Sequence, residues 1–330
     1  MANRDVGAAY MREKLLEGWR LRTLIASILV TVVGYLAFSI WSGWQDVLRA
    51  FALVGPSGLA AALGMSMLNY WLRFVRWQMY LNALGHSVPW QPSGRIYLAG
   101  FALTTTPGKA GEAMRGVLLK PWSVPYPHSF AALLSERLSD LTAVVLLTLF
   151  GLSVYPQAHA VIVLGMIAVL SGLVVLSQAT LLQRLYACTS GTTRRVIRLL
   201  HHLAHMLIEA RRCHSARVLL PATILSVLAW GAEAAAFHWI LQWLGADISL
   251  AFAVFVYALA MLAGALSFLP GGLGGAEAVM AGLLVWKGMS TAEAVAATVL
   301  IRLATLWFAV TLGLVSLIIS RNDRNRKVIA

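Results

Sequence analysis

The sequence predicts an all-α polytopic membrane protein with about six full transmembrane helices and two re-entrant helical hairpins in an inverted-topology repeat. Three observations lead to this fold class. Of the 330 residues, 59% are hydrophobic and only 12% are charged, which is too apolar for a soluble domain. The basic residues gather in four segments, and two similar helix breaks recur 163 residues apart.

Seven apolar runs set the order of the helices. A helix needs about 20 apolar residues to cross a hydrocarbon core of about 30 Å. The first run follows a charged segment, residues 1–21, and lacks a small-residue cleavage site, so we expect a retained helix and not a signal peptide. The runs are residues 22–41, 52–72, 128–150, 156–178, 218–244, 249–269 and 293–319.

The net charge of +13 is concentrated at the ends of these runs. Basic residues precede the first run, follow the second as Arg73 and Arg76, fill a loop at 184–217, and form a tail at 321–330. Loops rich in Lys and Arg stay in the cytoplasm. We therefore expect both termini to be cytoplasmic, in a bacterial inner membrane, and we expect no nucleic-acid binding. Arg73 and Arg76, beside Trp77, fit a clamp for a lipid headgroup at the interface and fit snorkelling interfacial anchors equally well.

The number of membrane crossings between the basic segments then requires one hairpin in each half of the predicted domain, 22–320. Between Arg95 and Arg184 the chain must leave the cytoplasm and return, which the runs 128–150 and 156–178 already achieve. Residues 92–120 must therefore enter and leave from the cytoplasmic side.

The second half gives the mirror arrangement. Residues 249–286 must enter and leave from the periplasmic side, because 218–244 runs outward and 293–319 runs inward. The units 92–150 and 249–319 thus have opposite orientations, as in transporters built from inverted repeats.

Each hairpin breaks at a Pro-Gly pair. A break at membrane depth frees backbone groups that lipid cannot satisfy, so it must line a protein cavity. Six positions are identical at the same offset, among them Pro107 and Pro270. The residues predicted to permit helix breaking and gating are Thr106, Pro107, Gly108, Gly111, Pro270, Gly271, Gly272 and Gly274.

Charged residues near these breaks predict an anion site. A charge at the bilayer centre costs about 2.5–3.5 kcal/mol on insertion scales, so each needs a partner or a function. The cations would bind a phosphate together with the free N–H groups of the helix N-termini, and the carboxylates would hold the cations or carry protons. The predicted substrate-binding residues are Lys109, Glu112, Arg115, Glu136, Arg137, Asp140, Glu277 and Arg302. The alternative is that these charges are internal ion pairs that only lock the hairpins.

Other features are weaker. His201 and His205 have helical spacing for a metal, but no carboxylate or cysteine completes a ligand set nearby, so we expect no metal and no cofactor. We also identify no catalytic residue.

Four motifs carry a resemblance to a known family. They are Thr106-Pro-Gly-Lys-Ala-Gly-Glu-Ala-Met-Arg115, Glu136-Arg-Leu-Ser-Asp140, Leu269-Pro-Gly-Gly-Leu-Gly-Gly-Ala-Glu277 and the closing Arg302-Leu. The chain resembles the transmembrane flippase-like domain of the lysylphosphatidylglycerol synthase family over residues 20 to 320. Where that family has Arg-Glu in the last motif, this sequence has Ala276-Glu277. The sequence ends eleven residues after the last run, so we expect no soluble synthase domain.

The resemblance implies lipid transport between leaflets, with a phospholipid or polyprenyl-phosphate glycolipid as cargo. A homodimer and a lipid-biosynthesis enzyme are the expected partners. Two alternatives remain open: a scaffold or regulator of envelope biosynthesis that acts through 184–217, and a lipid-phosphate-modifying enzyme.

Overall fold

A computed structural model of the chain describes residues 44–102, 104, 110–152, 159–189, 195–267 and 270–329. Every regular element in these ranges is a helix, which confirms the all-α class for this part. The α-helices are α3 (Trp44–Ala83), α4 (Trp90–Phe101), α5 (Ala110–Leu119), α6 (Tyr126–Leu152), α7 (His159–Ser177), α8 (Ala179–Thr189), α9 (Arg195–Cys213), α10 (Ala216–Trp243), α11 (Leu250–Leu266), α12 (Gly275–Trp286), α13 (Thr291–Arg302) and α14 (Phe308–Ile329). Short 3₁₀ turns span Lys120–Trp122 and Pro270–Gly272, and a π-helix, η5, spans Leu303–Trp307.

Several helices extend past the predicted apolar runs. The run 22–41 lies outside the described residues. α3 has 40 residues, with a kink at Gly55 (φ 66°) ahead of Pro56, and it continues beyond residue 72 to Ala83. The prediction that Arg73 and Arg76 follow the membrane-spanning helix is therefore wrong, because both lie inside α3 and are buried. The run 156–178 ends in a bend of 69° between α7 and α8.

Three of the described helices are long and apolar enough to cross a membrane. They are Gln45–Ala83, Ala216–Trp243 and Thr291–Ile319, and the bent pair α7–α8 makes up to a fourth. At 27 residues, α6 is also about 40 Å long, but it carries three charged residues near its middle. Helices α4, α5, α11 and α12 have 10 to 17 residues, too few for a full crossing.

Large apolar side chains cover the outside of the helix bundle. On α7 and α10 they recur every three or four residues, so each helix presents a continuous apolar stripe outward. The residues are Val163, Ile167, Leu170 and Val174, then Leu220, Ile224 and Leu228, all 46–66% exposed. Such a surface suits lipid and would be unfavourable in water.

The two halves of the chain are built alike. The loop from α3 to α4 turns at Gly85 (φ 85°), and the loop from α10 to α11 turns at Gly245 (φ 78°), 160 residues later. Backbone bonds from Gly85 to Asn82 and from Gly245 to Gln242, both 2.9 Å, close these turns in the same way. After each loop come two short helices, α4 and α5 or α11 and α12, and then a longer helical segment, α6 or α13 to α14.

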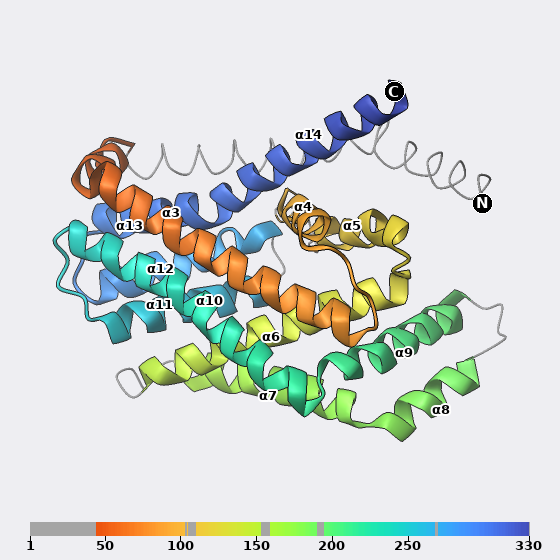
Figure 1. Ribbon diagram of the computed structural model, residues 1–330. Helices are drawn as coiled ribbons and strands as arrows, with labels where there is room; N and C mark the ends of the chain where they lie inside the picture. Colours follow the sequence, from red (N-terminus) through yellow and green to blue (C-terminus); the bar gives the residue numbers. More distant parts are fainter. Residues whose placement is uncertain are drawn as a thin grey trace.

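The equivalent helices α3 and α10 pack against each other in opposite directions. Asn69 Nδ2 donates to the carbonyl of Ala229 at 2.8 Å, and further along α3, Arg76 donates to Ser226, which is earlier in α10. Figure 1 shows the consequence: α4 and α5 lie at one end of the bundle, and α11 and α12 lie at the other.

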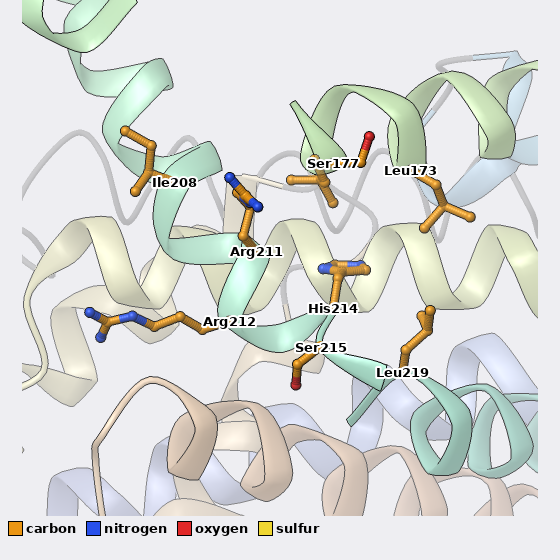
Figure 2. Close-up of a pocket in the computed structure, with 9 residues that line it drawn as sticks. Leu173, Ser177, Ile208, Arg211, Arg212, His214, Ser215 and Leu219 are labelled. Carbon is orange, nitrogen blue, oxygen red and sulfur yellow. The ribbon is translucent and has the colours of Figure 1, made fainter. Parts of the chain in front are cut away.

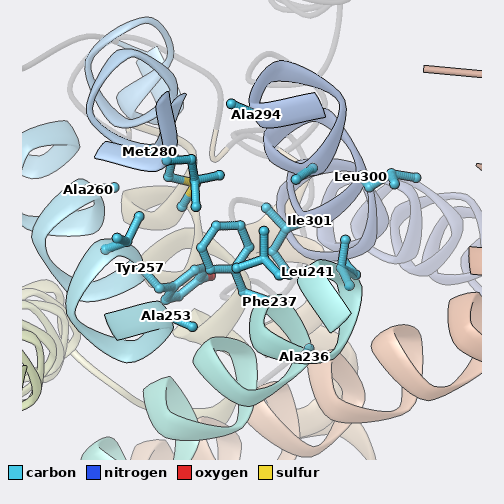
Figure 3. Close-up of a cluster of buried hydrophobic side chains, with 14 of the residues drawn as sticks. Ala236, Phe237, Leu241, Ala253, Tyr257, Ala260, Met280, Ala294, Leu300 and Ile301 are labelled. Carbon is cyan, nitrogen blue, oxygen red and sulfur yellow. The ribbon is translucent and has the colours of Figure 1, made fainter. Parts of the chain in front are cut away.

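A cluster of small and aromatic side chains joins α10, α11, α12 and α13. Phe237 and Tyr257 lie at its centre, and Met280 of α12 and Ile301 of α13 close it (Figure 3). Its alanines let the helices approach closely, which is typical of helix packing in membranes. This cluster fixes the second half of the site described next.

Candidate functional site

The charged residues of α6 face those of α3. Glu136 and Asp140 are four residues apart and therefore share one face of α6. Arg76 Nη1 lies 2.8 Å from Asp140 Oδ1, and Arg73 Nη2 lies 3.1 Å from Asp140 Oδ2. Trp230 of α10 also donates to Asp140, at 3.1 Å. One carboxylate thus connects α3, α6 and α10.

Arg115 of α5 is enclosed by its neighbours. Its Nη1 lies 2.8 Å from Glu136 Oε2, and both side chains are at most 1% exposed. The guanidinium lies over the ring of Tyr97, 4.3 Å from its centroid, an arrangement that stabilises a desolvated cation. Gly100 makes room for it, because a Cβ there would lie 2.3 Å from Arg115 Nε. This pair fastens α5 to α4 and α6.

In the second half an arginine and a glutamate hold the Pro-Gly break. Arg302 Nε lies 2.7 Å from Glu277 Oε1, and Arg302 Nη2 donates to the carbonyl of Gly271 at 2.8 Å. Glu277 Oε2 accepts the backbone N–H of Gly274 at 2.7 Å. Gly271, Gly272 and Gly274 have φ of 63°, 69° and 85°, a region that favours glycine. The π-helix η5, an element often found at functional sites, starts directly after Arg302.

A cavity of about 420 Å³ lies where these groups meet. Both halves of the chain contribute to it: α3 and α6 from the first, and α10, α11, α13 and the second break from the other. Its polar lining consists of Tyr70, Arg73, Thr104, Arg137, Asp140, Trp230, Glu233, Tyr257, Arg302 and Thr305. Apolar residues of α6, α11 and α14 complete its wall, including Leu141, Val144, Leu262 and Ala309.

The predicted site residues fall into three groups. Arg137, Asp140, Arg302, Gly271 and Gly272 line the cavity. Arg115, Glu136 and Glu277 are buried in the ion pairs beside it, and Gly274 caps α12. Thr106, Pro107, Gly108 and Lys109 lie outside the described residues; Gly111 and Glu112 belong to α5, but the side chain of Glu112 is outside the description, as is that of Pro270.

Four contributors to this site were not predicted from the sequence. Arg73 and Arg76 follow the apolar run, so hydropathy placed them at the membrane surface. Glu233 lies inside the apolar run 218–244 and was not assigned to the site. Tyr257 has no polar neighbour in sequence, although its repeat-related residue, Tyr97, contacts Arg115. Aligning the two halves at Gly85 and Gly245 would have paired Arg73 with Glu233 and Tyr97 with Tyr257.

A second cavity of about 620 Å³ opens between α7, the end of α9 and the start of α10 (Figure 2). Arg211, His214 and Ser215 line it beside Leu173 and Leu219. Burial lowers the pKa of the His214 imidazole, against a hydrogen bond to the carbonyl of Ala210 that raises it. The cavity is therefore cationic through its arginines, with His214 neutral near pH 7.

The histidines of α9 make local contacts. His201 stacks on Tyr186 of α8, with ring centroids 4.2 Å apart, and His205 lies 3.8 Å from Glu209. Within the described ranges no group of three or more His, Cys, Asp or Glu side chains could hold a metal.

Buried charge clusters, short broken helices and an apolar outer surface define a multi-pass membrane protein. Residues 24–313 match the family described as the lysylphosphatidylglycerol synthase TM region, and the chain belongs to this family. The predicted resemblance is thereby confirmed.

Relatives of similar length are archaeal membrane proteins. A UPF0104 membrane protein of Pyrococcus horikoshii is 23% identical over 318 residues, 88% of this chain and 94% of its own length. Another, from Methanothermobacter thermautotrophicus, is 25% identical over 320 residues, with shares of 88% and 93%. The glycosyltransferase AglD of Haloferax volcanii is 29% identical over 133 residues; the match spans 40% of this chain but only 20% of AglD.

Proposed function

We propose that this protein is a flippase that moves an anionic, phosphate-bearing lipid between the leaflets of a bacterial inner membrane. The observation that carries the proposal is the cavity of about 420 Å³ beside the second helix break. Three arginines from both halves of the chain line it: Arg73, Arg137 and Arg302. Arginine presents a planar set of donors that matches phosphate oxygens. The apolar wall suits the part of a lipid next to its headgroup.

The arrangement of the two halves supports alternating access. In this proposal α4–α5 and α11–α12 are re-entrant hairpins that enter from opposite sides, the full crossings number about six, and both termini are cytoplasmic. Helices α3 and α10 cross in opposite directions, as an inverted repeat requires. Rocking one half against the other would open the cavity first to one leaflet and then to the other.

Arg137 is the residue to test. Its side chain is 30% exposed, lines the cavity and lies 3.7 Å from Asp140. In Arg137→Ala, Arg73 and Arg76 still neutralise Asp140, so the fold should survive while the cavity loses a cation. We expect exchange to fall at least about tenfold, because a charge-assisted contact contributes about 1.5–3 kcal/mol.

The measurement is leaflet exchange of fluorescent phospholipid and polyprenyl-phosphate analogues in reconstituted vesicles. Arg184→Ala is the matched control, since Arg184 is an exposed arginine on α8 outside the cavity. Exchange that Arg137→Ala loses and Arg184→Ala keeps supports the proposal. Equal rates in protein-containing and empty vesicles for every analogue would overturn it and favour a scaffold or enzyme.

A further inference from the structure

Glu233 differs from the other buried carboxylates of the cavity region. Glu136, Asp140 and Glu277 each lie within 2.8 Å of an arginine nitrogen. Glu233, only 4% exposed in the middle of α10, accepts a hydrogen bond from the Tyr257 hydroxyl at 2.6 Å. Within the described part of the chain it forms no ion pair. It lines the cavity and so faces the space proposed for the headgroup.

The groups around Glu233 have opposing effects on its charge. The helices packed against α10 are α3, α6, α11 and α13. They bring Arg73 and Tyr70, Asp140, Tyr257 and Arg302 to the same cavity. Both arginines favour an ionised Glu233, but each is already bound to another carboxylate, and Asp140 opposes ionisation. Burial without a cation of its own favours the protonated acid.

Protonation also sets the net charge of the site. Among the described residues, five buried or cavity-lining arginines, Arg73, Arg76, Arg115, Arg137 and Arg302, face the four carboxylates Glu136, Asp140, Glu233 and Glu277. The site therefore has two positive charges in excess when Glu233 is protonated and one when it is ionised. An anion should bind more tightly to the protonated form, since charges interact strongly in a water-poor cavity.

We propose that Glu233 is a proton-binding site. When an anionic headgroup enters the cavity, the carboxylate of Glu233 takes up one proton. The proton comes from solution, converts the carboxylate to the acid, and is released when the anion leaves on the other side. Because coupling of binding equilibria is reciprocal, a bound anion must strengthen proton binding as much as the proton strengthens anion binding. This inference rests on the proposed function and adds its driving force, a proton gradient.

Calorimetry tests the coupling without any transport. A short-chain phosphatidylglycerol is titrated into the purified protein near neutral pH in buffers of different ionisation enthalpy, which yields the protons taken up per lipid bound. A phosphodiester has no titrating group near pH 7, so uptake reports the protein. We expect wild type to take up close to one proton per lipid at pH values where Glu233 is ionised before the lipid binds, with affinity falling up to about tenfold per pH unit over that range.

Glu233→Gln imitates the protonated acid and keeps an oxygen for the Tyr257 hydroxyl. It should bind the lipid without proton uptake, and its affinity should not change with pH. Asp247→Asn, an exposed carboxylate outside the cavity, is the matched control and should behave as wild type. Tyr257→Phe provides a second variant: it removes a donor that favours the ionised form, so the pH dependence of binding should move to higher pH.

In vesicles, an imposed pH gradient should accelerate exchange by wild type and leave Glu233→Gln unaffected. Wild type that binds or exchanges lipid with no proton uptake, or Glu233→Gln that takes up as many protons as wild type, overturns the role of Glu233 and leaves the flippase proposal intact. A wild-type protein that neither binds nor exchanges any lipid of the panel overturns both.

Discussion

The arginines of the candidate site differ in exposure and in partners, which distinguishes those that support the fold from those that are accessible in the cavity. Arg115 is 1% exposed and contacts Glu136 and aromatic rings. Arg137 lines the cavity with 30% of its side chain exposed. Desolvating an ion pair is expensive, but removing one partner is worse, because it leaves an uncompensated buried charge. A change of Arg115 should therefore lower the stability of the fold, whereas a change of Arg137 should mainly remove a cation from the cavity.

Glu136→Gln should destabilise the protein. It leaves the Arg115 guanidinium buried with no carboxylate at 2.8 Å, and removing one partner of a buried pair costs about 3–5 kcal/mol. The loss in the free energy of unfolding is measured in detergent, where the protein is unfolded by heating or by titration with SDS. The double change Arg115→Met with Glu136→Met should recover much of it, since no charge remains unpaired. A Glu136→Gln variant as stable as wild type would show that the pair contributes little.

The sequence identified charged site residues better than it identified their partners. Arg115, Glu136, Arg137 and Asp140 stood out because charges are rare in apolar helices, and all four are buried or line the cavity. Their pairing depends on which helices pack together. Arg115 reaches from α5 to Glu136 of α6, a contact that no spacing along one helix encodes.

Helices approach one another most closely where glycine removes a side chain. Gly313 of α14 lies against the end of α4, and a Cβ there would be 2.2 Å from the backbone nitrogen of Ala102. This contact holds the C-terminal helix next to the residues that precede the first break. By contrast, Gly282 of α12 has no neighbour within 4 Å of such a Cβ.

Gly313→Ala should destabilise the protein, because the clashing atoms belong to backbone and only a shift of α14 or α4 relieves them. Overpacking of this kind costs about 1–3 kcal/mol, or more where backbone must move. Gly282→Ala is the matched control and should be neutral or stabilising by up to about 1 kcal/mol, since alanine favours the helix. Thermal unfolding of the two purified variants in one detergent compares them directly; equal midpoints would contradict the packing argument.

Hydropathy predicted where helices are apolar but not where they end. α3 continues 11 residues past its apolar run because backbone hydrogen bonding and packing on α6 and α10 continue, and Arg73 and Arg76 find acidic partners there. The apolar run 156–178 stops where α7 ends, but the apolar pattern did not predict the bend of 69° into α8. The second Pro-Gly pair was the more reliable signal, since α11 ends near the predicted position; the first pair lies outside the described residues.

The whole molecule is organised by its repeat. The two loops at Gly85 and Gly245 close alike, the helices before them run in opposite directions, and the short helix pairs α4–α5 and α11–α12 after them lie at opposite ends (Figure 1). The antiparallel packing of α3 and α10 supports the inverted repeat that the basic segments predict, while the orientation of the two halves in the membrane stays a prediction. The sequence predicted an anion site beside the breaks but not the full lining of the cavity, because that lining comes from helices that are distant in the chain.

The proposed inverted arrangement predicts on which side of the membrane each loop lies. We expect Ser87→Cys and Lys120→Cys, before and after α4–α5, to be cytoplasmic, and Asp247→Cys and Lys287→Cys, before and after α11–α12, to be periplasmic. All four positions are exposed. In a background without the native cysteines, a membrane-impermeant maleimide should label Asp247→Cys and Lys287→Cys on intact cells. It should label Ser87→Cys and Lys120→Cys only after permeabilisation. Labelling of Ser87→Cys and Lys120→Cys from opposite sides would mean that α4–α5 crosses the membrane and is not re-entrant.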